Sequence, residues 1–185
     1  MNESRIKNFF NNFTFKKMIW FAPVLYFFHI LEEALFGFYI FINEPFESFL
    51  LMNIVLMIVY IFAISLFTLY SNRVTAFFAL GGLVAAQFYN AFFHLYMTII
   101  YRAYCPGIVS GFALYIPFVL ILSWKAYREE YITKTTAIIL YIIGAILMTL
   151  FEVEGLNIVV LFGWEAIYIT STIIYYLRNS KKKTT

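Results

Sequence analysis

The chain has 185 residues, of which 63% are hydrophobic and only 12% are charged, and its mean hydropathy is +0.83. This composition excludes an ordinary soluble domain, and spans of about 20 residues each leave no length for a second, soluble one. The net charge of +3 comes from basic residues outside the apolar runs, which argues against a nucleic-acid partner, and the single cysteine, Cys105, excludes an intrachain disulfide and a multi-cysteine metal site.

Six apolar runs follow one another along the chain, separated by short polar or turn-forming stretches. They cover residues 18–42, 49–70, 74–101, 108–127, 136–151 and 156–177. Runs of this length predict transmembrane helices, so the expected fold is an all-α polytopic membrane helix bundle with six spans. Five spans are the alternative, because the fifth run is the shortest and could fuse with the sixth or be re-entrant.

The distribution of basic residues predicts the orientation. With both termini cytoplasmic, 12 of the 13 Lys and Arg residues lie inside, and Arg102 alone lies outside. We therefore expect a cytoplasmic segment at residues 1–17, a transmembrane domain at residues 18–177 and a basic cytoplasmic tail at residues 178–185. The tail suits anionic headgroups, and membrane lipids are the expected surroundings.

The first run carries three ionisable side chains where a membrane helix is normally apolar. Glu32 and Glu33 follow His29 by three and four residues, so all three share one face of the expected helix. A charged carboxylate near the bilayer centre costs about 2.5–3.5 kcal/mol on insertion scales, more than one interhelical polar pair returns. A functional site therefore explains this cluster better than a hydrogen-bonded packing clamp does.

Two later runs carry polar residues at a similar depth. Asn90 and His94 share one face of the third run, and Gln87 lies about one turn earlier. The sixth run contributes Glu165. At 1.5 Å per residue, Glu33 lies about 22 Å and Asn90 about 24 Å above the cytoplasmic ends of their runs, and Glu165 lies about 13 Å below the external surface. The three runs are therefore expected to meet at one level.

No Lys or Arg lies near these acids in the expected spans, so something else must balance their charge. A divalent metal ion, with zinc as one candidate, fits best because it binds neutral imidazole and carboxylate together. The expected ligands are His29, Glu33 and His94, with Glu165 as an optional fourth. Glu32 is expected to carry protons as the catalytic acid or base. The residues expected to orient the ligands or to cover the site are Asn90, Gln87 and Tyr104.

Three sequence motifs occur in an order that resembles a known family, the HXXEE family of bacterial integral membrane proteins. They are His29-Ile-Leu-Glu32-Glu33, the second histidine His94, and Tyr104-Cys105-Pro106-Gly107. The resemblance covers roughly the first four helices. It implies a location in the bacterial cytoplasmic membrane and prompts the hypothesis of a metal-dependent hydrolase or protease. Pro106 and Gly107 also predict an external turn.

The sequence supports three kinds of activity. An intramembrane enzyme that uses the metal to hydrolyse a lipid or a membrane peptide is the first hypothesis, because three protein ligands leave a position for water. The site is similar in logic to intramembrane proteases of the CAAX type, although Gly37 stands where those enzymes have an arginine. A carrier of protons or metal ions is the second hypothesis, and a lipid isomerase without a cofactor is the third. No feature of the sequence fixes an oligomeric state.

Overall fold

The structure, a computed structural model, describes residues 12–152 and 157–181, and every regular element in those ranges is a helix. In chain order the elements are α2 (Phe15–Met18), α3 (Phe21–Leu35), α4 (Phe38–Phe41), α5 (Phe46–Tyr70), α6 (Arg73–Leu83), η1 (Val84–Tyr89), α7 (Asn90–Tyr101), α8 (Ile108–Ser110), η2 (Gly111–Tyr115), α9 (Ile116–Arg128), α10 (Lys134–Phe151) and α11 (Asn157–Lys181). The all-α expectation is confirmed.

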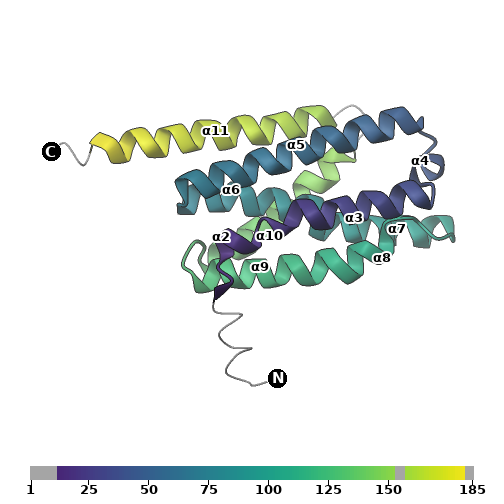
Figure 1. Ribbon diagram of the computed structural model, residues 1–185, viewed down its shortest axis with the longest axis horizontal. Helices are drawn as coiled ribbons and strands as arrows, with labels where there is room; N and C mark the ends of the chain where they lie inside the picture. The colour runs from purple at the N-terminus through teal and green to yellow at the C-terminus, as the bar shows by residue number, and fades with distance from the viewer. Residues whose placement is uncertain (1–11, 153–156, 182–185) are drawn as a thin grey trace, which may run out of the picture.

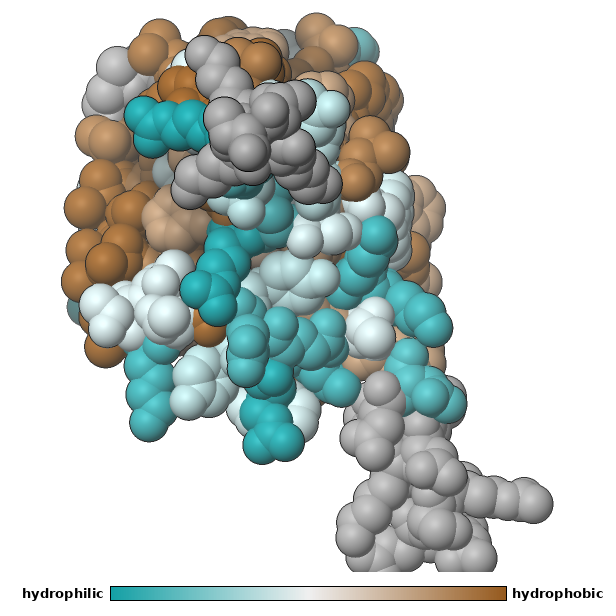
Figure 2. Space-filling model, turned by 90° about the vertical axis from the view of Figure 1, so that its left-hand side faces the viewer, coloured by the Kyte–Doolittle hydropathy of each residue, from teal (hydrophilic) through white to brown (hydrophobic). Residues whose placement is uncertain are grey.

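Six helical segments in the described ranges are long and apolar enough to cross a membrane. They are Phe15–Leu35, Phe46–Tyr70, Arg73–Tyr101, Ile108–Arg128, Lys134–Phe151 and Ile158–Ser180. The prediction of six spans is confirmed, and the fifth run forms a span of its own with 18 residues. Figure 2 looks onto one end of the bundle and shows hydrophilic residues gathered there and hydrophobic residues along the flanks. The protein is therefore a membrane protein whose flanks face lipid.

Successive spans run in opposite directions, so α2 and the last turns of α11 lie at the same end of the bundle (Figure 1). We call this the inner end, following the orientation expected from the basic residues, and the opposite end the outer end. The third span, α6–η1–α7, is the most buried of the six, because 56% of an 18-residue apolar stretch within it is buried inside the bundle. It packs against α5, α9, α10 and α11 and is the central element of the fold.

The first span ends earlier than the apolar run predicts. The helix stops at Leu35, because Gly37 adopts a left-handed conformation with φ +77° that a regular helix does not contain. The chain then turns into the short helix α4, which brings Phe38 back toward the bundle, where it is buried. The residues that the sequence assigned to the end of a long helix therefore form a cap over the outer end.

The last two spans do not reach as far outward as the others. Helix α10 has 18 residues and α5 has 25, which correspond to about 27 Å and 37 Å of length at the usual rise. Figure 1 shows that α11 begins short of the outer end reached by α5 and α7 and extends beyond α6 at the inner end. Residues of α11 therefore lie deeper in the bundle than a count from an outer surface suggests.

Two π-helical segments interrupt the third and fourth spans. They are η1 (Val84–Tyr89), directly before α7, and η2 (Gly111–Tyr115), directly before α9. Pro117 lies just after η2 and has no N–H to donate to the carbonyl four residues earlier, which favours the wider turn. Such segments often occur next to functional sites. Here one lies in the span that supplies the second histidine, His94, and the other lies in the span that supplies Ser110 and Tyr115.

Gly144 allows α10 to pack closely against η1. A Cβ added at Gly144 would lie 2.7 Å from Val84 Cγ1 and 3.2 Å from the backbone nitrogen of Ala85. We therefore expect Gly144→Ala to destabilise the protein by about 1–3 kcal/mol, the usual cost of overpacking, measured as a lower midpoint of thermal unfolding in detergent. Gly163→Ala is the matched control, because nothing lies within 4 Å of its added Cβ. Equal midpoints for the two variants would contradict this account of the packing.

Candidate metal centre

Two histidines and one glutamate converge inside the outer part of the bundle. His29 and Glu33 lie one turn apart on α3, and His94 comes from α7. Glu33 Oε1 lies 3.3 Å from His29 Nε2 and 3.2 Å from His94 Nε2. The three residues are 2%, 5% and 0% exposed for His29, Glu33 and His94. The structure thus brings together the three residues that the sequence analysis expected as the principal metal ligands.

The spacing of these atoms suits a shared cation. One ligand atom from each of the three residues lies within 4.8 Å of the other two. Ligand atoms that bind zinc tetrahedrally at about 2.0–2.1 Å are separated by about 3.3 Å, close to the two observed Nε2–Oε1 distances of 3.3 and 3.2 Å. Neither of the two buried Nε2 atoms has a hydrogen-bond partner among the described residues. The two distances fit a site in which one cation could lie between the three ligand atoms.

The other ring nitrogen of each histidine has a partner of its own. His29 Nδ1 lies 2.8 Å from Ser110 Oγ, and this hydroxyl donates to the Gly107 carbonyl oxygen. In the tautomer in which His29 Nδ1 donates to Ser110 Oγ, the nitrogen with the lone pair is His29 Nε2, which faces Glu33.

His94 repeats this arrangement with a thiol in place of the hydroxyl. Its Nδ1 lies 3.3 Å from Cys105 Sγ, and that thiol contacts the Pro106 carbonyl oxygen at 3.8 Å as a donor. In the tautomer in which His94 Nδ1 donates to the thiol sulfur, His94 Nε2 also turns a lone pair toward Glu33. In these two tautomers a cation between the three groups would remove the repulsion between the two lone pairs and the carboxylate oxygen.

Aromatic rings surround the cluster. The Tyr115 ring centroid, from η2, lies 4.6 Å from that of His29, and the Phe38 centroid, from α4, lies 5.0 Å from that of His94. The two imidazole centroids are 5.0 Å apart and nearly perpendicular. These contacts fix the ring orientations and keep the surroundings apolar, which strengthens any electrostatic interaction at the cluster.

The loop of residues 104–107, called the 104–107 loop below, covers the cluster at the outer end. Gly107 has φ +98°, and a Cβ added there would lie 2.6 Å from His94 Cε1 and 2.9 Å from His29 Cε1. The backbone therefore lies against both imidazole rings at a distance that only glycine permits. The external turn predicted from Pro106 and Gly107 is present, and it forms the roof of the site.

Glu32 binds this loop and the adjoining helix α8 instead of joining the cluster. Its Oε1 accepts hydrogen bonds from the Tyr104 hydroxyl, from Gly107 N at 3.0 Å and from Val109 N at 3.2 Å. Its Oε2 accepts from Ser110 N at 2.7 Å. Burial and the bond to Glu32 raise the pKa of Tyr104, which keeps its hydroxyl protonated as a donor. The expected role of Tyr104 in covering the site is consistent with this contact.

Glu165 lies away from the cluster, contrary to the expectation that it could serve as a fourth ligand. Its neighbour Trp164 donates from Nε1 to the Phe78 carbonyl oxygen at 3.3 Å. Phe78 precedes His94 by 16 residues on the same span, which corresponds to about 24 Å along the axis. The depth count failed because α10 is short and α11 begins below the outer end.

The two amides of the third span also have other surroundings. Gln87 is fully buried, and its Nε2 donates to the Ala22 carbonyl oxygen at 3.1 Å, which ties η1 to α3. Asn90 Oδ1 is buried and has no hydrogen-bond partner among the described residues. The structure thus gives neither amide a hydrogen bond to the His–Glu–His cluster.

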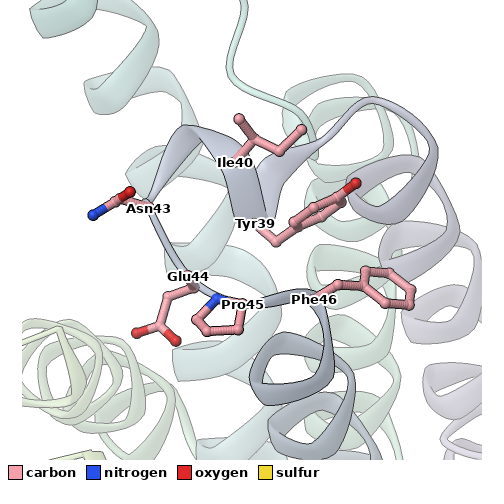
Figure 3. Close-up of a pocket in the computed structure, with 6 residues that line it drawn as sticks. All are labelled: Tyr39, Ile40, Asn43, Glu44, Pro45 and Phe46. Atoms are coloured by element: carbon pink, nitrogen blue, oxygen red, sulfur yellow. The ribbon is translucent and has the colours of Figure 1, made fainter.

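A surface hollow of about 430 Å³ lies beside α4 (Figure 3). Figure 3 shows Asn43 and Glu44 pointing away from Tyr39 and Phe46, so the polar groups do not converge. Specific small-molecule sites need convergent polar groups in an enclosed space. The buried cluster is therefore the better candidate.

Sequence reasoning missed two of the residues that contact the histidines, Ser110 and Tyr115. A serine or a tyrosine in an apolar run is common and gives no signal of its own. Their position relative to His29 depends on η2, because that segment turns the chain just after the loop. Cys105 and Gly107 lie in a recognised motif, but the motif does not reveal that both contact His94.

The fold and the cluster together define a six-span membrane protein with a buried His–Glu–His site beneath an outer loop. The family model described as proteins of unknown function with an HXXEE motif matches residues 20–122, more than half of the 185 residues. The chain belongs to this HXXEE family. No curated protein and no solved structure matches it. The matched region includes the cluster and the 104–107 loop and ends before α10 and α11.

Proposed function

We propose that the protein is an intramembrane metalloenzyme of the bacterial cytoplasmic membrane. His29 Nε2, His94 Nε2 and the Glu33 carboxylate hold one divalent ion, zinc in the first instance, and the site hydrolyses a lipid or a membrane peptide. The observation that carries the proposal is the convergence of two buried imidazole Nε2 atoms on one carboxylate oxygen at 3.3 and 3.2 Å. The bacterial location rests on the family resemblance alone.

A shared proton explains this geometry less well than a metal ion does. Hydrogen bonds between a protonated imidazole and a carboxylate have heavy-atom distances of about 2.7–2.9 Å, shorter than the observed 3.3 and 3.2 Å. One proton between two atoms also leaves the second Nε2 lone pair facing the carboxylate oxygen. A metal ion accepts electron pairs from all three groups at once, and two nitrogens with one carboxylate form a ligand set that zinc enzymes use.

The remaining residues support this role by position. Ser110 Oγ and Cys105 Sγ contact the two Nδ1 atoms and so orient both imidazoles, and with a metal ion on the Nε2 atoms they would accept the Nδ1–H groups. A bound divalent ion would supply Lewis acidity and lower the pKa of a coordinated water to about 7. Both carboxylate oxygens of Glu32 accept hydrogen bonds, from Gly107 N in the loop and from Ser110 N in α8. The proposed role of Glu32 as a proton acceptor therefore requires the loop and α8 to move away from it. Opening of the 104–107 loop would also admit substrate from the surrounding lipid.

The test of metal binding is the metal content of the purified protein. We expect about one zinc ion per chain after loading, and at least a tenfold loss of affinity in His29→Ala, His94→Ala and Glu33→Gln, measured by elemental analysis and chelator competition. Glu165→Gln is the matched control and should keep its metal, because it changes a buried carboxyl far from the cluster. Wild-type protein that binds no divalent ion, or variants that bind it equally, would rule out the metal centre.

Hydrolysis is tested by comparing metal-loaded protein with chelator-stripped protein. Both are placed in liposomes made from bacterial lipids that contain a labelled transmembrane peptide. Products detected by mass spectrometry only with the metal-loaded protein would support the enzyme. Metal-loaded liposomes that show ion flux and no product would favour a carrier. Lipid isomerisation that survives metal removal would favour the cofactor-free reaction.

A further inference from the structure

A second cavity lies between α5, α6 and α11, on the inner side of the metal centre. It has a volume of about 60 Å³, and its wall includes Tyr60, Phe78, Trp164 and Glu165. One water needs about 10–15 Å³ of such space, so the cavity has room for a small group of several heavy atoms. It lies beside the part of the third span from Phe78 to Ala86, which is about 12–24 Å from His94 along the axis, and it shares no lining residue with the His–Glu–His cluster.

Two polar side chains of this cavity lack partners. Glu165 is 8% exposed, and its Oε2 has no hydrogen-bond partner among the described residues. Tyr60 is 7% exposed, and its hydroxyl is also without one. Burying such groups without partners is costly. An occupant of the cavity that contacts both groups would remove this cost.

The aromatic walls of the cavity are held in place by hydrogen bonds and ring stacking within the protein. Trp164 is fixed by its bond to the Phe78 carbonyl oxygen, at 3.3 Å. The Phe78 ring stacks on Tyr168 with centroids 5.2 Å apart, and the Tyr168 hydroxyl donates to the Ala63 carbonyl oxygen at 3.1 Å. The walls are therefore organised before any ligand arrives, which lowers the entropic cost of binding.

The chemistry of this wall selects a cation. None of the residues that line the cavity is basic, so the Glu165 carboxyl is either protonated or paired with a bound cation. Aromatic rings beside a carboxylate form the kind of enclosure that recognises substituted ammonium groups. We propose that this cavity binds the head of an alkylammonium amphiphile taken from the membrane, with Glu165 as its counter-ion.

The shape of the cavity fits an amphiphile that enters from lipid. Ala79, Gly82 and Ala86 follow one another along one face of the third span and line the cavity with little side-chain volume. At Gly82 an added Cβ would meet only Trp164 Nε1, at 3.5 Å. Gly82, Ala86 and Leu161 are partly exposed on the flank of the bundle. An alkyl chain can lie along this flank while the charged head reaches Glu165.

The experiment uses the full chain in lipid nanodiscs with Trp164 as the reporter. Trp20 and Trp124 are exposed on the bundle and are replaced by phenylalanine. Dodecyltrimethylammonium is titrated in, and dodecanol is the uncharged comparison. We expect a saturable change in Trp164 fluorescence with the ammonium compound, and binding at least tenfold weaker in Glu165→Gln, because the counter-ion is lost in an apolar site. Proton release on binding should disappear in the same variant.

A matched control and a second variant separate binding from folding. Glu152→Gln changes an exposed carboxyl at the end of α10 and should bind as the parent protein does. Glu165→Asp keeps the charge and should bind with intermediate affinity, and it replaces Glu165→Gln if that variant does not fold. An equal response to dodecanol, or unchanged ammonium binding in the variant of Glu165 used, would overturn the proposal. Metal content is independent of this outcome, because the two sites share no residue.

Discussion

Replacing Gly107 by alanine is expected to disrupt the proposed metal centre although none of its ligand residues is replaced. The added Cβ would lie 2.6 Å from His94 Cε1 and 2.8 Å from His94 Nε2, closer than carbon atoms approach in proteins. Either the 104–107 loop or the imidazole rings must move. Because displaced second-sphere contacts typically cost 10–100-fold in metal affinity, we expect a loss of about that size, measured by competition with a zinc chelator.

Gly37→Ala provides the control for backbone strain. Gly37 also has a left-handed conformation, with φ +77°, but its added Cβ would meet only the Ile40 side chain, at 3.4 Å. Both variants carry strain of about 1–3 kcal/mol from the positive φ, so both should unfold at a lower temperature. Only Gly107→Ala should lose zinc affinity. Equal zinc affinities in the two variants would show that the loop does not constrain the histidines.

The spans and the central cluster could be predicted from sequence because both depend on simple periodicities. Apolar runs of sufficient length specify transmembrane helices, and the fifth run proved long enough on its own. His29 and Glu33 are four residues apart and must share a helix face, so any partner of one is close to the other. The convergence with His94 then required only that the first and third spans be neighbours at that depth.

The division of roles between the adjacent glutamates could not be predicted from helix geometry. Glu32 and Glu33 are separated by about 100° around the helix axis, and both can face a common interior. What separates them is the 104–107 loop together with α8, which returns over the outer end. This segment offers the backbone N–H groups of Gly107, Val109 and Ser110 to Glu32. A loop conformation carries little periodic signal, so the sequence does not reveal which carboxylate it will bind.

The depth of Glu165 in the bundle depends on how far α10 and α11 reach toward the outer end, and hydropathy does not define that reach. Counting depth from an outer surface assumes that every helix reaches that surface, and the hairpin of α10 and α11 does not. The family match also ends at residue 122, before these two helices. The His–Glu–His cluster lies within the region that the family model matches. The cavity beside Glu165 is lined partly by that region and partly by α11, which lies beyond it.

Glu32→Gln is expected to open the 104–107 loop, with Cys105 as the reporter. The carboxylate of Glu32 accepts hydrogen bonds from the Tyr104 hydroxyl and from three backbone N–H groups. A glutamine directs an amide NH₂ at some of these donors and has no charge to strengthen the others. Since hydrogen bonds to a charged group contribute about 1.5–3 kcal/mol each, the open population should rise roughly 10–100-fold.

The thiol of Cys105 reports this opening because it is fully buried when the loop is closed. Burial, together with the nearby charges of Glu33 and Glu32, raises the pKa of the Cys105 thiol to about 12. Opening exposes the thiol and lowers its pKa, so the reactive thiolate increases at any pH below that value. The rate of labelling by a bulky maleimide at pH 8 should therefore rise by at least the increase in the open population.

Tyr104→Phe and Glu44→Gln set the scale for this measurement. Tyr104→Phe removes one of the four donors to Glu32, at the exposed edge of the site. It should accelerate labelling by only about 3–10-fold, because a solvent-exposed hydrogen bond contributes about 0.5–1.5 kcal/mol. Glu44→Gln changes an exposed carboxyl in the outer loop after α4 and should leave the rate unchanged. Labelling of Glu32→Gln at the parental rate would mean that Glu32 does not hold the loop closed.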